Sequence, residues 1–184
     1  MENAMSLFLS EGALREHREY LSTLKHRASI YRKSGIDIYE AEKGRRTFGV
    51  VPFEEFCEIK ELALEIKMHE IYFNSFGQTF IPCTKIKQHF GSENNFAFLI
   101  GRFAQKIKHG FVCVYSDKRG RVDFCYEDEL KPDFTVHLAL DVCEHAYFKD
   151  YGFKKDAYVR KALTYLDFSK INLHFENDAE RKNI

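Results

Sequence analysis

The sequence predicts an α+β fold, with two long helices in the first half and a mixture of helices and antiparallel strands in the second. Three observations predict it. Apolar residues recur at spacings of three and four over two stretches before residue 77. Three later stretches are rich in β-branched and aromatic residues, and the third of them alternates in polarity. The first two of them flank Asp117-Lys118-Arg119-Gly120-Arg121, a run typical of a hairpin turn.

The composition argues against several classes of protein. The chain has 184 residues, enough for one or two small domains with cores of their own. Its 28 basic and 28 acidic residues cancel, which argues against a general nucleic-acid binder. No apolar run approaches the ~20 residues that would span a membrane, so we expect no membrane partner. The start of the chain resembles neither a signal nor a transit peptide, and its five cysteines are scattered, so we expect a cytoplasmic protein with reduced thiols.

The first helix is expected to run from Ser10 to about Lys33. Ser10 can cap its first turn, and one face carries apolar side chains at helical spacing. An imidazole on such a face is more often a hydrogen-bonded core residue than a metal ligand, and the residues alone leave both interpretations open for His17. The face is formed by Leu14, His17, Leu21, Leu24 and Ala28.

A glycine-containing loop is expected at 34–51, before a second helix that begins at Pro52 and runs to about Phe76. Gly77 is expected to end this helix. Residues 78–87 are expected to form a connector without regular structure. The apolar side of the second helix is formed by Phe56, Leu62, Ile66, His69, Phe73 and Phe76.

The second half is expected to contain a helix, three strands and a closing helix. The first of these helices is expected to end near Lys108. The strands are expected at 111–115, 122–126 and 134–140, arranged as an antiparallel meander. The closing helix is expected from Lys154 to about Phe168, and the polar tail from Glu176 to Ile184 is expected to be frayed.

The segment after the third strand carries the chemistry of the chain. The apolar run of this strand ends at Asp141, and His145 follows four residues later. A buried strand therefore delivers a carboxylate and an imidazole to one end of the sheet, and these are two ligands for a borderline metal ion. The spacing alone fits a hydrogen-bonded Asp–His pair equally well.

The eleven residues from Asp141 to Tyr151 resemble the signature D-x-W-E-H-A-Y-Y-x-D-Y of the iron/manganese superoxide dismutase family. They depart from it at Cys143, where the family has Trp, and at Phe148, where it has Tyr. The segment His69 to Gly77 is similar to the family's H-x-x-Y-F/W-x-x-L-G. The resemblance keeps one register from about Ser10 to Ile171.

The resemblance implies an N-terminal helical hairpin domain, residues 1–86, packed on a C-terminal α/β domain, residues 87–184, with a three-stranded antiparallel sheet. His26 competes with His17 as the first ligand, but it lies on another face of the helix and the residues before it do not match. Zn would also bind such a ligand set. The implied ligands of one Fe or Mn ion per chain are His17, His69, Asp141 and His145.

The resemblance also implies a homodimer. Glu144 is similar to the family Glu that hydrogen-bonds the ligand His of a partner subunit, so it would meet His145 of the other chain. Phe148 stands where the family has a Tyr that contacts the partner across the same interface. The plainer interpretation of Glu144 is an exposed residue that follows a strand.

Several positions around the implied site differ from the family. Its gateway His and Tyr correspond to Leu21 and Lys25. We expect Lys25 to attract superoxide or another small anion, although it can also extend from the helix edge into water. The family Gln that bonds metal-bound solvent corresponds, in the iron-type register, to Glu65. The expected catalytic residues are therefore Lys25 and Glu65.

The other register of that Gln points to Glu127 or Glu129. Three Trp positions that line the family site are Phe73, Phe111 and Cys143, which makes the implied pocket less bulky. Cys143 can be oxidised by peroxide, can join the metal ligands, or can be an inert buried thiol.

The sequence therefore supports more than one function. The first is a metal-dependent, superoxide dismutase-like protein that disproportionates superoxide to O₂ and H₂O₂ with altered surroundings of the metal. The alternative is a non-catalytic scaffold or interaction protein of the same fold, with a structural metal or none. A metal-dependent oxidase or hydrolase is a third, for which no nucleophile–base constellation is found.

Overall fold

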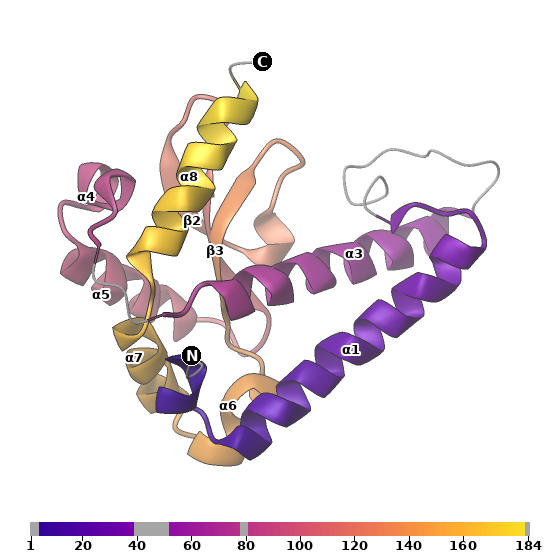
Figure 1. The fold of residues 1–184 in the computed structure, drawn as a ribbon, viewed down its shortest axis with the longest axis horizontal. Helices are drawn as coiled ribbons and strands as arrows, with labels where there is room; N and C mark the ends of the chain where they lie inside the picture. The colour runs from indigo at the N-terminus through magenta and orange to yellow at the C-terminus, as the bar shows by residue number, and fades with distance from the viewer. Residues whose placement is uncertain (1–3, 39–51, 78–80, 183–184) are drawn as a thin grey trace.

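The computed structural model describes residues 4–38, 52–77 and 81–182, and it confirms the α+β architecture (Figure 1). The predicted loop at 34–51 lies mostly outside these residues. In chain order the elements are η1 (Ala4–Leu7), α1 (Glu11–Lys33), α3 (Phe53–Asn74), α4 (Thr84–Phe90), α5 (Glu93–Ala104), β1 (Phe111–Ser116), β2 (Val122–Tyr126), η2 (Glu127–Glu129), β3 (Thr135–Asp141), α6 (Glu144–Tyr151), α7 (Lys155–Thr164) and α8 (Phe168–Lys182).

Helices α1 and α3 form the predicted antiparallel hairpin, which projects away from the rest of the molecule (Figure 1). The Ser10 side chain accepts a hydrogen bond from the backbone N–H of Ala13 and caps α1. Near its tip the hairpin has an apolar cluster of its own, and at the other end the two helices meet the sheet and α6. The buried members of the tip cluster are Leu24, Ala28, Ile38, Ile59, Leu62, Ala63 and Ile66.

The sheet is three-stranded and antiparallel, but its order is β2-β1-β3, so the predicted meander is wrong. Strand β1 is almost wholly buried and takes the centre, whereas β2 has exposed positions that suit an edge. The connection through η2 then brings β3 to the other edge of β1. The register pairs Phe111 with Asp141, so the end of β3 lies beside the start of β1.

Four helices of the second half differ from expectation. Helix α4 begins within the stretch predicted as a connector and takes up its last residues, 84–87, and the predicted domain boundary after residue 86 falls within it. The division into two domains remains a prediction. Helix α6 was not anticipated, and the single closing helix is instead α7 followed by α8. The predicted frayed tail is helical as far as Lys182, because Ile171 and Phe175 bury one side of α8 against the body of the protein.

Asp167 starts α8 and fastens it to the end of α3. Its buried carboxylate accepts hydrogen bonds from the backbone N–H and hydroxyl of Ser169, and its own N–H donates to the carbonyl of Ser75. The N–H of Gly77 donates to the carbonyl of Tyr165 beside it. Among the described residues no helix is both long and apolar enough to cross a membrane.

This junction leaves no room for a side chain at residue 77. A Cβ atom on Gly77 would lie 1.9 Å from Oδ2 and 2.8 Å from Cβ of Asp167. We therefore expect Gly77→Ala to lower the free energy of unfolding by about 1–3 kcal/mol, measured by urea denaturation.

Gly101→Ala is the matched control. Gly101 lies inside α5, and a Cβ atom there would make only ordinary contacts, the nearest with Leu163 Cδ1 at 3.4 Å. Alanine is the better helix former, so this variant should be as stable as the original protein or slightly more so. Equal effects of the two substitutions would show that the Gly77–Asp167 junction is not tightly packed.

Candidate metal centre

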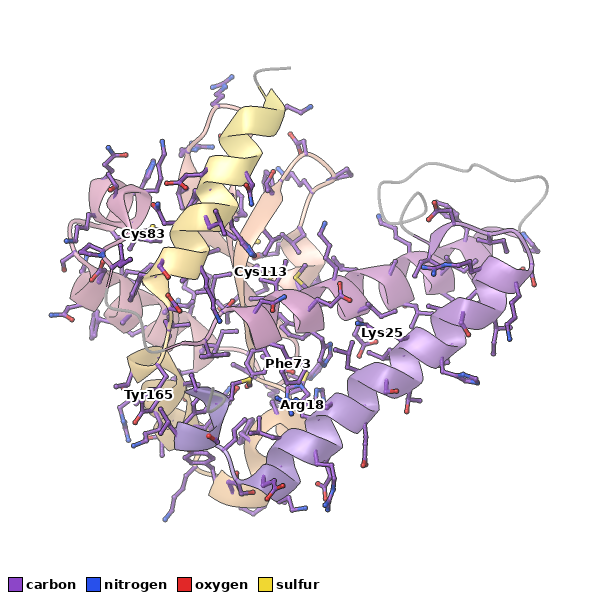
Figure 2. The ribbon with its side chains drawn as sticks, in the orientation of Figure 1. Arg18, Lys25, Phe73, Cys83, Cys113 and Tyr165 are labelled. Carbon is purple, nitrogen blue, oxygen red and sulfur yellow. The ribbon has the colours of Figure 1, made fainter. Side chains whose placement is uncertain are left out.

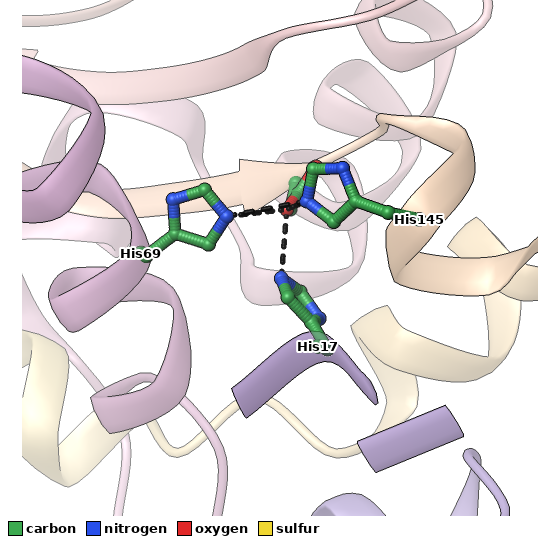
Figure 3. Close-up of side chains that lie close together, drawn as sticks. His17, His69 and His145 are labelled. Atoms are coloured by element: carbon green, nitrogen blue, oxygen red, sulfur yellow. Dashed lines mark hydrogen bonds and ion pairs between the residues drawn. The ribbon is translucent and has the colours of Figure 1, made fainter. Parts of the chain in front are cut away.

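Four polar side chains from four elements converge where the helical hairpin meets the sheet (Figure 3). His17 comes from α1 and His69 from α3. Asp141 is the last residue of β3, and His145 lies in the first turn of α6, which follows directly. Asp141 and His145 are thus positioned by the corner between β3 and α6. His17 and His69 reach them only because the α1–α3 hairpin packs against the sheet.

The donor atoms of these residues are spaced as a metal shell requires. Oδ2 of Asp141 lies 3.0 Å from Nε2 of His17, 3.5 Å from Nε2 of His69 and 3.1 Å from Nε2 of His145. Nε2 of His69 and of His145 are 3.2 Å apart, and all four donors lie within 4.8 Å of one another. Metal–ligand bonds of about 2.0–2.2 Å bring their ligand atoms to such separations.

Burial makes the cluster a better metal site than a hydrogen-bonded one. The side chains of His17, His69 and Asp141 are fully buried. Within the described residues neither nitrogen of His17 makes a hydrogen bond, although its Nε2 lies 3.0 Å from Oδ2 of Asp141. Buried polar atoms are rarely left unpaired. Three imidazoles and one carboxylate suit Fe, Mn or Zn, so the residues fit a metal ion.

The protonation states of Asp141 and His69 also favour the binding of a cation. Burial alone would raise the pKa of Asp141, but the hydrogen bond from His145 and the closeness of the His17 imidazole hold it well below its usual value, so the carboxylate is charged. Burial lowers the pKa of His69 and favours the neutral imidazole that metals bind. At His145 burial lowers the pKa, but the hydrogen bond to Asp141 and the charges of Asp141 and Glu65 together raise it, so a metal ion displaces a proton there.

Neighbouring groups fix the ligands in place. Nδ1 of His69 donates to the carbonyl of Glu65 at 2.8 Å, which leaves Nε2 free to face the cluster. The N–H of Cys143 donates to Oδ1 of Asp141 at 2.8 Å. The buried hydroxyl of Tyr158 donates to the carbonyl of Asp141, also at 2.8 Å, and contacts the hydroxyl of Tyr72.

Tyr20 belongs to the site and was missed by the sequence reasoning. Its ring centroid lies 4.4 Å from that of His145 and 5.4 Å from that of His69, and its hydroxyl donates to Oε1 of Glu65 at 2.5 Å. The available signal was its position three residues after His17, which puts both residues on one side of the helix. The contact with Glu65 brings this carboxylate to the edge of the site.

Lys25 faces another residue of the hairpin. Lys25 lies on α1 (Figure 2). Its Nζ is 2.6 Å from Oε1 of Glu70, and both side chains are about half exposed. Lys25 and Leu21 line a hollow with Arg18, Glu70 and other residues, none of which belongs to the cluster. The charge of Lys25 is therefore largely offset where it stands, and a catalytic role for it remains a prediction.

Three smaller side chains occupy the expected Trp positions. The ring of Phe73 lies 4.8 Å from that of His17, and Phe111 makes an edge contact with His69 at 5.0 Å. The thiol of Cys143 accepts a hydrogen bond from the N–H of Gly110. Burial, together with the charge of Asp141, raises the pKa of Cys143 well above its usual value, so the inert thiol is the best supported of its three expected states.

Two acidic residues after β2 were candidates for the site, and burial and the charges around the cluster shift the pKa of Glu127. Glu129 accepts a hydrogen bond from the N–H of Tyr126 and is exposed. Burial raises the pKa of Glu127 to about 7, and the charges of Glu65 and Asp141 add to the shift. A carboxyl group that changes its charge near neutral pH therefore lies within electrostatic reach of the cluster.

The expected interface residues lie on the open side of α6. Glu144 is exposed, and Phe148 is 43% exposed and packs its ring edge-on against Phe153, which is 93% exposed. Within the described part of the chain, no hydrogen bond engages Nδ1 of His145. The Phe148–Phe153 pair and part of the His145 ring are thus exposed to solvent in the single chain.

Residues 82–174 match the family model described as the C-terminal domain of the iron/manganese superoxide dismutases. The match includes Asp141 and His145, whereas His17 and His69 precede it. A search of curated proteins found no match.

Glu127 gives the metal-free protein a pH-dependent stability. Its folded pKa is raised above the unfolded value, so the stability is fully present below about pH 4.5 and is lost as the pH rises through about 7. Glu127→Gln should therefore be more stable than the original protein at pH 8, by up to roughly 3 kcal/mol, and equal to it near pH 4.5.

Urea denaturation of the chelator-treated protein across this range measures the difference. Asp128→Asn removes a charge from the exposed neighbouring residue and controls for general charge effects. A constant difference between Glu127→Gln and the original protein at every pH would show that Glu127 is already ionised in the folded state.

Proposed function

The chain belongs to the iron/manganese superoxide dismutase family, and from this premise we propose that it holds one Fe or Mn ion and disproportionates superoxide to O₂ and H₂O₂. The observation that carries the proposal is the gathering of four donor atoms within 4.8 Å of one another, three of them from fully buried side chains, with both nitrogens of His17 otherwise unpaired. The proposed ligands are His17, His69, Asp141 and His145.

When bound, Fe or Mn supplies the one-electron oxidation and reduction that dismutation needs. The other tasks belong to the chain. Asp141 compensates the charge of the ion, and the Glu65 carbonyl orients the His69 ring. Glu65 is proposed as a catalytic residue because its carboxylate accepts a hydrogen bond from the Tyr20 hydroxyl at the edge of the site. Lys25 is proposed to add a weak attraction for superoxide or another small anion, since Glu70 offsets most of its charge.

We also propose that two copies associate through α6. In this arrangement Glu144 of one copy accepts a hydrogen bond from the uncovered Nδ1 of His145 in the other. Phe148 and Phe153 supply the apolar area that association needs, since they are exposed side by side in the single chain.

A second candidate function is a scaffold of the same fold whose metal, including Zn, is structural. The observation in its favour is that the residues at the expected gateway do not face the cluster: Lys25 is paired with Glu70, and Leu21 lines a separate hollow. Bound metal without superoxide turnover would support it.

The decisive experiment combines elemental analysis with a superoxide assay on the same sample. We expect about one Fe or Mn per chain with measurable activity, and we expect His69→Ala and Asp141→Ala to lose both, because each removes a donor from a buried set. His26→Ala is the matched control, since His26 is an exposed imidazole on α1.

Stoichiometric Fe or Mn without activity would reject the dismutase proposal and leave the scaffold. Full activity in either ligand variant would reject the site. Circular dichroism of each variant would show whether the fold survives.

The proposed dimer is tested by analytical ultracentrifugation at micromolar concentration. The original protein should sediment as a dimer, and Phe148→Ser should shift it toward the monomer by about tenfold or more in dissociation constant, because a central aromatic contact is lost. Phe98→Ser is the matched control, since Phe98 is 60% exposed on α5. A monomeric original protein would contradict the proposed interface.

A further inference from the structure

Three sulfur-bearing side chains from three elements meet on one face of the sheet. Cys113 lies on the central strand β1 (Figure 2) and is paired directly with Cys125 on β2. Directly opposed residues of antiparallel strands carry their side chains on the same face, with Cβ atoms about 4.5–5.5 Å apart. Sγ of Cys113 also lies 3.6 Å from Sδ of Met68, which belongs to α3. Two thiols and one thioether are therefore brought together between the sheet and α3.

This spacing suits a metal ion with three sulfur ligands. Metal–thiolate bonds of about 2.3 Å place three sulfur atoms around one ion about 4 Å apart. The separation of 3.6 Å between Cys113 and Met68 is close to this value. The thiol of Cys125 starts from the opposed position on β2, so a rotation about its Cα–Cβ bond is enough to complete the set.

The donor atoms decide which ion suits this group. Thiolate and thioether sulfur are soft ligands that select Cu(I), whereas imidazole and carboxylate donors suit Fe and Mn. The four-residue cluster offers nitrogen and oxygen, and the group around Cys113 offers sulfur. The two groups therefore select different ions.

The surroundings of the three sulfur atoms exclude water. Cys113 and Met68 are fully buried, and Cys125 is 5% exposed. Burial raises the pKa of both thiols, that of Cys125 to about 12, so both are protonated while no metal is bound. A Cu(I) ion displaces the two protons when it binds. The positive charge of Lys67, next to Met68 on α3, favours the thiolate form of Cys113.

We propose that Cys113, Cys125 and Met68 form a second metal site, which binds one Cu(I) ion through two thiolates and one thioether. The ion reaches them by local opening of β2, an edge strand with exposed positions. The site shares no residue with the four-residue cluster, so the inference is independent of the proposed dismutase function.

The test is an anaerobic titration of the metal-free protein with Cu(I), in competition with the coloured chelator bicinchoninate. We expect the original protein to withhold one Cu(I) per chain. Cys113→Ser and Cys125→Ser should each weaken binding by about hundredfold or more, because each removes a thiolate. Met68→Leu nearly conserves the side-chain volume and should weaken binding by about tenfold, because only the weaker thioether ligand is lost.

Cys83→Ser is the matched control. Cys83 is also a buried thiol, but its Sγ donates to Oδ1 of Asn172 on α8. This variant should bind Cu(I) as tightly as the original protein does. A loss of binding equal to that of Cys125→Ser would show a general effect of removing a buried thiol and would overturn the site.

X-ray absorption at the copper edge of the original protein is a second measurement, which needs no variant. Sulfur neighbours at about 2.3 Å support the site. Nitrogen or oxygen neighbours alone would place the copper on the histidine cluster and overturn it, as would a protein that withholds no Cu(I). A protein that holds no Fe or Mn can still pass this test, so the failure of one proposal is distinguishable from the failure of the other.

Discussion

The buried charge of Asp141 is the constraint on which the rest of this structure depends. An ionised carboxylate removed from water costs several kcal/mol unless it is compensated. The chain supplies a hydrogen bond from the Cys143 N–H and places three imidazoles around Oδ2. None of these groups carries a permanent positive charge. A metal cation resolves the imbalance, because it satisfies the carboxylate and the unpaired nitrogens of His17 together.

This requirement couples the ligand site to the assembly of the fold. Asp141 and His145 share one strand-to-helix corner, but His17 and His69 reach them only when the α1–α3 hairpin docks on the sheet. The same junction is fastened by the Tyr158–Asp141 hydrogen bond and by Glu16 and Lys149, which pair α1 with α6. A cation at the centre would therefore stabilise the docked arrangement more than any of its parts, which is how metal binding commonly contributes to folding.

The sequence was informative wherever a pattern is local. Periodicity located α1, α3 and the three strands within a few residues, and the Asp141–Tyr151 motif identified the family. The sheet order could not be read, since β1 and β3 are both almost wholly buried and burial alone does not tell which of them takes the centre. The last part of α8, from Glu176, was taken for a polar tail because its sequence is almost entirely polar. Tyr20 was overlooked because its role depends on the position of Glu65 on another helix.

The charges around the site bear on what it can do. Glu65 and Glu127 both act on the electrostatics of the cluster, in addition to the Asp141 ligand. Negative groups near a metal stabilise its higher oxidation state and repel an incoming anion. Two features moderate this effect: the Tyr20 hydroxyl donates to Glu65, and the pKa of Glu127 near 7 leaves that group partly protonated at neutral pH. The chain thus keeps extra acidic groups at the candidate metal centre in forms that lessen their charge, which would favour the entry of an anion such as the proposed substrate.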